Sequence, residues 1–494
     1  MTPAPALPIV LALVGAALAT LAWQRVRLQR AVSLASLTGA LVAAGAMLAA
    51  TRDGTVLTTE VGGWSADIGI ALSVDLTSAL LLTVSLATML AVLVFSIAQR
   101  TDDPRVFHPT YLVLTAGVSL AFITGDLFNL FVSFEMLLIA SYVLVSLGGR
   151  RDQVSHGMTY VVINLLASTL FITTIAFVYA ACGTVNLAEL GVRFPALDDD
   201  LRLALGLLVL TVFGIKAALF PLFSWLPDAY PAAPTPITAI FAGLLTKVGV
   251  YALVRSSTSL GLQDLGPILL VAAGLTMVIG VLGAIAQNDV KRILSFHVVS
   301  QIGYMVMGLG LFTVAGIAGA ILFVIHQIPV KTSLFLVGGL IEAREGTGAL
   351  DRLGGLARAV PLVAALFVLP ALSLAGIPPF SGFVAKLSLI EAGSAAQSYV
   401  IVAVSLVGSA LTLFSMTKIW AGAFWGAAPE DAPEPAEASD DPTSGRPNHA
   451  LALAATIGAV GLTVLIAVAS GPLYEWSVTA AEQLLAGPSG TVGP

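Results

Sequence analysis

Five of the six lysines in this 494-residue chain lie within apolar stretches. They are Lys216, Lys247, Lys331, Lys386 and Lys418, and only Lys291 lies in a polar loop segment. A lysine at the centre of a lipid-spanning helix costs about 3 kcal/mol on insertion scales. Arginine stays charged under almost any condition, whereas a desolvated lysine can lose its proton near neutral pH. This distribution therefore favours proton handling over structural ion pairing.

A buried carboxylate accompanies these lysines. Glu135 lies roughly 14 Å into an apolar span that follows Asp126, at a rise of 1.5 Å per residue. A carboxylate at that depth must be protonated or paired. We expect Glu135 to pair with Lys216, because a Glu–Lys contact that can separate would act as a proton gate. The alternative is a static ion pair that only holds helices together.

The other buried basic groups predict further positions along a proton path, which we call stations. Lys247 is the next station after Lys216, and Lys386 ends the path. His326 and Lys331 share one span, five residues apart, and Pro329 loosens the helix between them. His326 suits a proton relay, although a hydrogen-bonded core histidine is the alternative.

Other polar residues fit structural roles better. Lys418 lies near Trp420 and Trp425, which predicts that its amine snorkels to the interface. We expect Asp75 to cap a helix or to meet a partner subunit, and Cys182 to be a small buried hydrophobe. No phosphate-binding loop, nucleophile triad or metal-ligand spacing stands out, so no cofactor or metal is expected.

The composition identifies the class of protein. Hydrophobic residues make up 57% of the chain and charged residues 10%, and the mean hydropathy is +0.97. Soluble domains are nearer 25% charged, so we predict an all-α polytopic membrane protein. The net charge of -6 says little about partners, because most charges lie in loops, and no basic patch suggests nucleic acid. The single cysteine excludes an internal disulfide.

Windows of about 20 apolar residues predict fourteen membrane spans. They lie near 7–23, 31–50, 70–98, 109–125, 127–148, 158–182, 203–225, 234–256, 265–286, 293–311, 314–340, 361–391, 397–425 and 450–471. The tail after Gly471 is short, and we expect it on the outer surface.

The loop charges predict the orientation. Alternate loops hold thirteen basic residues on one side and four on the other. The richer side has Arg25, Arg27, Arg30, Arg100, Arg105, Arg150, Arg151, Lys291, Arg292, Arg344, Arg352, Arg358 and Arg446, and the poorer side has Arg52, Arg193, Arg202 and Arg255. The positive-inside rule puts the richer side in the cytoplasm and both termini outside. The uncharged start before the first arginines predicts a retained first helix rather than a signal peptide.

Two spans contain helix-breaking prolines and a lysine. The span 203–225 is broken near Pro221, and the span 361–391 is broken near Pro378 and Pro379. Interrupted helices at matching places in two halves indicate an inverted-repeat transporter core. We therefore divide the chain into N-terminal helices (1–108), a first repeat (109–256), a second repeat (265–425), an acidic disordered cytoplasmic loop (426–448), and a last helix with its tail (449–494).

The motifs resemble one family of membrane subunits. They include the embedded Glu135, the sequence Trp225-Leu226-Pro227-Asp228-Ala229 after Lys216, the sequence Asp289-Val290-Lys291-Arg292, and Gly376-Ile377-Pro378-Pro379-Phe380. The chain resembles the antiporter-like subunits shared by respiratory complex I and Mrp-type multisubunit cation/proton antiporters. The segment 241–251 is most similar to the Mrp branch, and Lys386 argues against one complex I subunit that carries glutamate there.

The resemblance implies more than the residues alone do. It implies fourteen helices with inverted five-helix repeats, and essential roles for Glu135 and Lys216. It also implies a bacterial cell membrane complex with Mrp subunits A, B, C, E, F and G that exchanges H⁺ and Na⁺ in a lipid bilayer. One departure is His326-Gln327, where relatives often carry a second histidine.

Three functions are compatible with these residues. The first is a proton-translocating subunit of a Na⁺/H⁺ antiporter, which is a transporter and not an enzyme. The second is a proton-pumping subunit of a complex I-type oxidoreductase or a membrane-bound hydrogenase. The chain has no flavin, nicotinamide or iron–sulfur signature, so redox chemistry would belong to partner subunits. The third is a passive scaffold whose buried charges only hold helices together.

Overall fold

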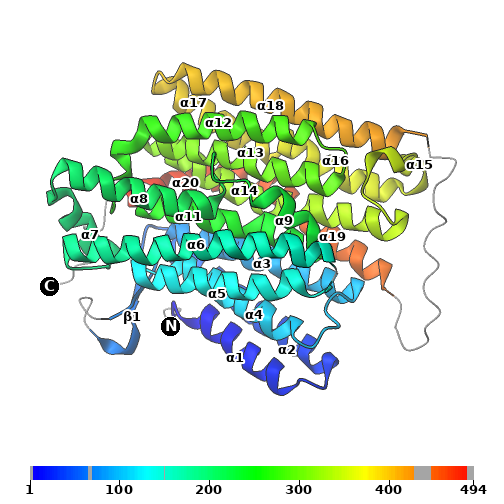
Figure 1. The fold of residues 1–494 in the computed structure, drawn as a ribbon, viewed down its shortest axis with the longest axis horizontal. Helices are drawn as coiled ribbons and strands as arrows, with labels where there is room; N and C mark the ends of the chain where they lie inside the picture. Colours follow the sequence, from blue (N-terminus) through cyan, green and yellow to red (C-terminus); the bar gives the residue numbers. More distant parts are fainter. Residues whose placement is uncertain (1–3, 65–68, 150, 428–446, 487–494) are drawn as a thin grey trace.

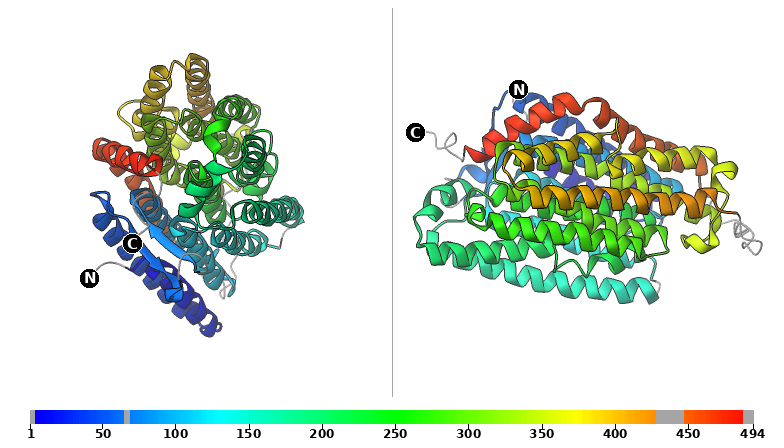
Figure 2. Two further views of the ribbon diagram at one scale, coloured as in Figure 1. Left: turned by 90° about the vertical axis from the view of Figure 1, so that its left-hand side faces the viewer. Right: turned by 90° about the horizontal axis from the view of Figure 1, so that it is seen from above.

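The structure is a computed structural model that describes residues 4–64, 69–149, 151–427 and 447–486. Long helices run side by side along the longest axis of the molecule, and the other two views show the same bundle (Figure 1, Figure 2). The chain is therefore a mostly helical membrane protein, as its composition predicts. Most of the acidic segment 426–448, together with Arg150 and Arg446, lies outside the described residues.

In the described part of the chain the α-helices are α1 (Leu7–Leu21), α2 (Val26–Thr51), α3 (Leu76–Gln99), α4 (Phe107–Ile123), α5 (Leu127–Ser146), α6 (Arg151–Cys182), α7 (Leu187–Arg193), α8 (Asp199–Ala217), α9 (Leu226–Ala232), α10 (Thr235–Ile240), α11 (Thr246–Ser256), α12 (Gly266–Ile285), α13 (Val290–Gly310), α14 (Val314–Glu345), α15 (Leu356–Ala359), α16 (Pro361–Ala375), α17 (Ser381–Ala395), α18 (Tyr399–Ile419), α19 (His449–Val468) and α20 (Ser470–Leu485). Short 3₁₀ turns are η1 (Val61–Gly63), η2 (Phe194–Ala196), η4 (Leu262–Leu265) and η5 (Leu350–Arg352). Two π-helical segments, η3 (Phe241–Leu245) and η6 (Trp420–Trp425), continue into or out of α-helices.

Among the described residues, ten helical stretches are long and apolar enough to cross a membrane. Three shorter apolar helices, α1, α4 and α16, accompany them. Each of the predicted spans contains a helix, although the span 203–225 is helical only to the end of α8 before its turn. The span 361–391 is divided between α16 and α17.

Burial separates central helices from peripheral ones. The apolar windows of α14 and of the continuous stretch Thr235–Ser256 are entirely buried, and that of α13 is nearly so. In contrast, most residues in the apolar windows of α6, α12, α18 and α19 are not fully buried. Four of the buried lysines lie on or beside the central helices, so the protein itself surrounds them.

Both predicted helix breaks are present. α8 ends at Ala217, where Ala218 adopts a left-handed conformation, and the indole nitrogen of Trp225 donates to the carbonyl of Ile215 over 3.1 Å. α16 ends at Ala375 before Gly376, which also has a positive φ, and α17 begins at Ser381. A cis X–Pro bond lies in each break, at Pro221 and at Pro379.

Two elements differ from the sequence prediction. Residues 57–74 contain a β-hairpin, in which β1 (Leu57–Glu60) pairs antiparallel with β2 (Ala71–Val74). The predicted span 70–98 is therefore helical only from Leu76, because the carboxylate of Asp75 accepts the backbone N–H of Ser78 and caps α3 there. The expected short tail after Gly471 instead forms most of α20, which packs on α14 and α3.

A buried ionic cluster fixes the α1–α2 hairpin to the bundle. Asp102, in the loop before α4, accepts from Arg30 Nε at 2.6 Å and contacts His108 Nε2 at 3.0 Å. His108 Nδ1 lies 3.0 Å from Ser33 Oγ on α2. Burial disfavours the charged carboxylate, but the hydrogen bond from His108 and the Arg30 guanidinium outweigh it, so the pKa of Asp102 is lowered.

Replacing Asp102 with Asn should destabilise the protein by about 3 kcal/mol, because the guanidinium of Arg30 loses its buried partner. The lowered pKa means that the stabilisation is complete above the ordinary carboxyl pKa of 3.8 and is lost as the pH falls through the folded value. Thermal unfolding of the purified protein at neutral and acidic pH measures the difference. The control is Asp53→Asn in an exposed loop. Equal melting temperatures for the Asp102 variant and the wild type at neutral pH would contradict the assignment.

Candidate functional site

Glu135 and Lys216 are connected through a serine rather than directly. Lys216 Nζ donates to Ser168 Oγ over 3.2 Å and to the carbonyl of Asn164 over 3.4 Å. Ser168 Oγ in turn donates to Glu135 Oε1. No ion pair within 4 Å joins these two described side chains, so in this structure the predicted contact is made through Ser168. The reason is that α6 lies against both α5 and α8 and inserts Ser168 between them.

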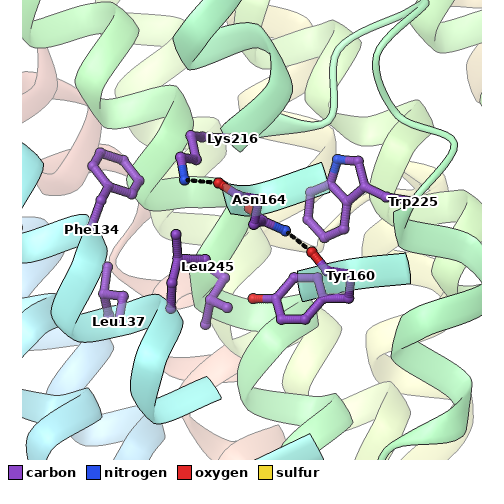
Figure 3. Close-up of a pocket in the computed structure, with 8 residues that line it drawn as sticks. Phe134, Leu137, Tyr160, Asn164, Lys216, Trp225 and Leu245 are labelled. Atoms are coloured by element: carbon purple, nitrogen blue, oxygen red, sulfur yellow. Dashed lines mark hydrogen bonds between the residues drawn. The ribbon is translucent and has the colours of Figure 1, made fainter. Parts of the chain in front are cut away.

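A small cavity adjoins the amine of Lys216. It has a volume of about 20 Å³, and its wall includes Phe134, Tyr160, Asn164 and Trp225. Figure 3 shows Asn164 between Lys216 and Tyr160, with hydrogen bonds to each. This volume is sufficient for one ordered water molecule. The site can therefore be hydrated without opening the bundle.

Lys247 obtains its partners from an irregular helix. It follows the π-helical segment η3, and its amine donates to the carbonyl of Ala242 and to Thr246 Oγ1, the latter over 3.4 Å. A π turn disturbs the regular hydrogen-bond ladder and exposes carbonyl oxygens. Gly249 permits close contact with α8, because a Cβ there would lie 2.6 Å from the backbone nitrogen of Ala217. This packing brings the helix of Lys247 against the end of the helix of Lys216.

Lys331 and His326 lie in the fully buried part of α14. The amine of Lys331 has no hydrogen-bond partner among the described residues. His326 Nδ1 lies 2.9 Å from Ser381 Oγ at the start of α17, and its Nε2 has no partner in the described structure. Buried polar atoms normally have a protein or water partner, and these two atoms have no protein partner among the described residues.

Lys386 binds the end of the other broken helix. Its amine donates to the carbonyls of Leu374 and Ala375 over 3.0 and 3.1 Å. These are among the last carbonyls of α16, which have no acceptor role within the helix and carry its negative dipole end. The amine also lies 4.8 Å from the ring centroid of Tyr304. The break in the helix thus creates the binding site for the lysine.

Four of the buried lysines, those predicted to carry protons, share one property that a lipid-facing lysine would lack. Their relative exposures are 4% for Lys216, 1% for Lys247, 0% for Lys331 and 4% for Lys386. None of these amines is directed to the lipid headgroups. Within the described part of the molecule no hydrogen bond joins one lysine directly to the next, so proton transfer between them requires water or side-chain movement.

Lys418 has a different environment. Its amine donates to the carbonyls of Ile285 and Gln287 and to Asn288 Oδ1, over 2.6 to 2.9 Å. It therefore binds the C-terminal end of α12 and the polar loop that follows it, which is compatible with the predicted snorkelling towards the end of the span.

Sequence reasoning missed several polar residues of the site. Ser168 and Asn164 lie one turn apart on α6, and Ser381 begins α17. His297 on α13 is also fully buried, with Nε2 2.8 Å from Ser415 Oγ. The sequence feature that could have identified these residues is an isolated Ser, Asn or His within an apolar helix. No group of three His, Cys, Asp or Glu residues in the described ranges has a metal-binding arrangement.

Comparison with known proteins gives consistent similarities. A family model described as the transmembrane part of NADH:quinone oxidoreductase/Mrp antiporters matches residues 124–412. The D subunit of the Na⁺/H⁺ antiporter of Alkalihalophilus pseudofirmus is 42% identical, over 93% of this chain and 92% of that relative. The protein of the same name in Bacillus subtilis is 38% identical, over 85% and 86% of the two chains. A chain in the structure of the Mrp complex from Dietzia sp. superposes with a TM-score of 0.91 and 37% identity, over 98% of both chains.

Proposed function

Because this chain belongs to the NADH:quinone oxidoreductase/Mrp antiporter transmembrane family, we propose that it is the D-type, proton-translocating subunit of a multisubunit Na⁺/H⁺ antiporter. The observation that carries this proposal is the enclosure of four lysine amines within the protein, away from its surface. A passive scaffold would pair such amines with carboxylates. Here their hydrogen-bond partners are hydroxyls and backbone carbonyls, and the amine of Lys331 has none among the described residues.

The proposed relay runs from one half of the chain to the other. It begins at Glu135 and Lys216, passes Lys247, continues through Lys331 and His326 on α14, and ends at Lys386. Water would carry the proton between stations, because the described side chains do not join directly. The unpartnered atoms of Lys331 and His326, and the cavity beside Lys216, support water at those places.

Ser168 links Glu135 and Lys216 in the first step of the proposed relay. A hydroxyl has one proton, so Ser168 can donate to Glu135 while it accepts from the ammonium of Lys216. When Lys216 passes its proton onward, its neutral amine can accept, and the hydroxyl is free to turn. With the hydroxyl turned to the amine, the carboxylate of Glu135 loses a hydrogen-bond donor and takes up the next proton more readily. Ser168 thus couples the carboxylate to the amine without a locked ion pair.

The same family membership supports a membrane topology for the chain. We place fourteen transmembrane helices in the bacterial plasma membrane, with both termini outside, and inverted five-helix repeats at 109–256 and 265–425. The helix breaks after α8 and α16 support this, since a buried lysine lies beside each one. The segments 1–108 and 449–494 would flank the repeats, and the acidic segment 426–448 would be cytoplasmic.

The partners proposed for this chain are Mrp subunits A, B, C, E, F and G, together with lipid, H⁺ and Na⁺. Any redox activity would belong to other subunits, so the chain itself is proposed to be a transporter subunit and not an enzyme. A role in a complex I-type oxidoreductase or a membrane-bound hydrogenase has less support, because the relatives at 42% and 38% identity carry antiporter names.

Glu135→Gln and Lys216→Ala should each reduce proton exchange at least about tenfold, equivalent to roughly 1.4 kcal/mol on the limiting step. Everted membrane vesicles from cells that lack other Na⁺/H⁺ antiporters measure this as Na⁺-driven change in internal pH. Glu189→Gln in the short helix α7 is the matched control for the carboxylate. If both variants assemble fully and exchange protons at the wild-type rate, the relay is not the function of these residues.

Ser168→Ala should slow exchange because it removes the link between Glu135 and Lys216, and Ser168→Thr should restore it because the hydroxyl returns. We expect the exchange rate to fall about three- to tenfold. This corresponds to the loss of one hydrogen bond to a charged group, reduced because a water molecule can partly replace the hydroxyl. The control is Thr169→Ala, whose hydroxyl bonds only to its own helix on an exposed face. Equal rates for the Ala and Thr variants at position 168 would show that the bridge has no role.

A further inference from the structure

A second, much larger cavity lies at one end of the bundle and is not part of the relay described above. It has a volume of about 490 Å³. Its wall includes Gln99 at the end of α3, residues 231–236 from the end of α9 to the start of α10, Lys291 at the start of α13, and Glu342 in the last turn of α14. In the proposed orientation this end faces the cytoplasm. A polar cavity of this size holds many water molecules.

An ion pair lies in the wall of this cavity. Lys291 Nζ is 2.5 Å from Glu342 Oε2, and Thr235 Oγ1 donates to the same carboxylate oxygen over 3.3 Å. The side chain of Lys291 is 9% exposed and that of Glu342 is 26% exposed. The carboxylate is therefore accessible from the cavity, whereas its ammonium partner is mostly buried behind it.

Other charges surround this pair. Asp289, which caps α13, directs its second carboxylate oxygen towards Gly348, where a Cβ would lie 2.8 Å from that oxygen and 3.2 Å from Glu342 Oε1. Gly348 thus lets two carboxylates approach the same point. Arg292 on α13 pairs with Asp228 on α9 over 2.7 Å, so it does not neutralise either of them.

The remaining charges belong to α14 itself. In its last turn Arg344 pairs with the neighbouring Glu345 over 3.0 Å. Lys291 is therefore the cation that Glu342 contacts within the described residues. If the carboxylate of Glu342 takes up a proton, it becomes a neutral acid and this contact is no longer needed.

Inward from the cavity, α14 carries a series of buried polar atoms that lack partners among the described residues. They are Ser333 Oγ, Lys331 Nζ, Gln327 Oε1 and His326 Nε2. Gly339 is the innermost residue of α14 in the cavity wall. Ser333 lies six residues further in, which is roughly 9 Å along the helix. Unpartnered buried polar atoms are the places where ordered water is expected.

We propose that this cavity is the proton-uptake vestibule of α14 and that Glu342 with Lys291 forms its gate, an assignment that rests on the proposed function. A water-borne proton converts the carboxylate of Glu342 to a neutral carboxylic acid, and hydronium becomes water. The neutral acid no longer holds Lys291, whose ammonium turns towards Asp289. The acid then releases its proton through water to the neutral amine of Lys331, which becomes an ammonium. The carboxylate re-forms and pairs again with Lys291.

The test compares two carboxylates of the same helix. Glu342→Gln should reduce the initial rate of proton exchange at least about fivefold. It should also flatten the dependence of that rate on pH at the cytoplasmic face, which is the outer face of everted vesicles. Glu345→Gln, one turn away and outside the cavity wall, should behave as the wild type. The dependence on Na⁺ concentration should be unchanged in both variants.

Two outcomes would overturn the assignment. An unchanged pH dependence in Glu342→Gln removes the carboxylate from proton uptake. A changed dependence on Na⁺ alone assigns the cavity to the metal cation instead. Because Glu135→Gln and Lys216→Ala are measured in the same vesicles, the two proposals separate. If those variants block exchange and Glu342→Gln does not, the vestibule assignment is wrong and the proposed function stands. If Na⁺ flux through the wild-type complex moves no protons, the proposed function itself is wrong.

A labelling experiment tests hydration of the vestibule independently of transport. In a Cys182→Ser background, Ala232→Cys places a thiol in the cavity wall, and Ala239→Cys places one on α10 outside the wall and fully buried. A charged, membrane-impermeant thiol reagent added to the cytoplasmic face should modify the first cysteine and not the second. Failure to modify position 232 in assembled complex would show that the cavity is closed to water.

Discussion

An ammonium group cannot be buried among apolar helices unless oxygen atoms replace its water. Regular helices use nearly all their carbonyl oxygens internally, so few are available inside a bundle. For Lys247 and Lys386 these oxygens come from irregular helix geometry. A π-helical segment provides the carbonyl of Ala242 for Lys247, and the end of α16 provides those of Leu374 and Ala375 for Lys386. These irregular segments therefore allow Lys247 and Lys386 to be buried inside the bundle.

Oxygen ligands of this kind suit a site that must change its charge. A carboxylate partner would hold an ammonium permanently, because separating two buried charges costs several kcal/mol. Carbonyl and hydroxyl oxygens stabilise the charged amine less strongly, so the neutral amine is also accessible. Ser168 extends this principle to Glu135, since the hydroxyl weakens the contact between opposite charges without removing it. In the proposed relay, α14 would connect the two halves, because it is packed against both of them.

The sequence predicted the buried lysines and the helix breaks better than it predicted the hydrogen-bond partners of those lysines. Lysines in apolar spans and prolines within those spans are local features, and both breaks lie where the prolines indicate. The bridge through Ser168 depends on how three helices pack, which no local pattern encodes. The vestibule depends on the ends of several helices that are far apart in the sequence. The β-hairpin was missed because its strands are short and the second one merges into the apolar run of α3.

In the proposed relay, protons move through water between amines held inside the protein. A density map of the assembled complex in lipid, at a resolution that shows ordered water, tests this most directly. We predict water molecules beside Lys216, at the free amine of Lys331 and at Nε2 of His326, in a series that reaches Lys386. Continuous dry packing of apolar side chains between these groups, in maps recorded at both high and low pH, would contradict the relay.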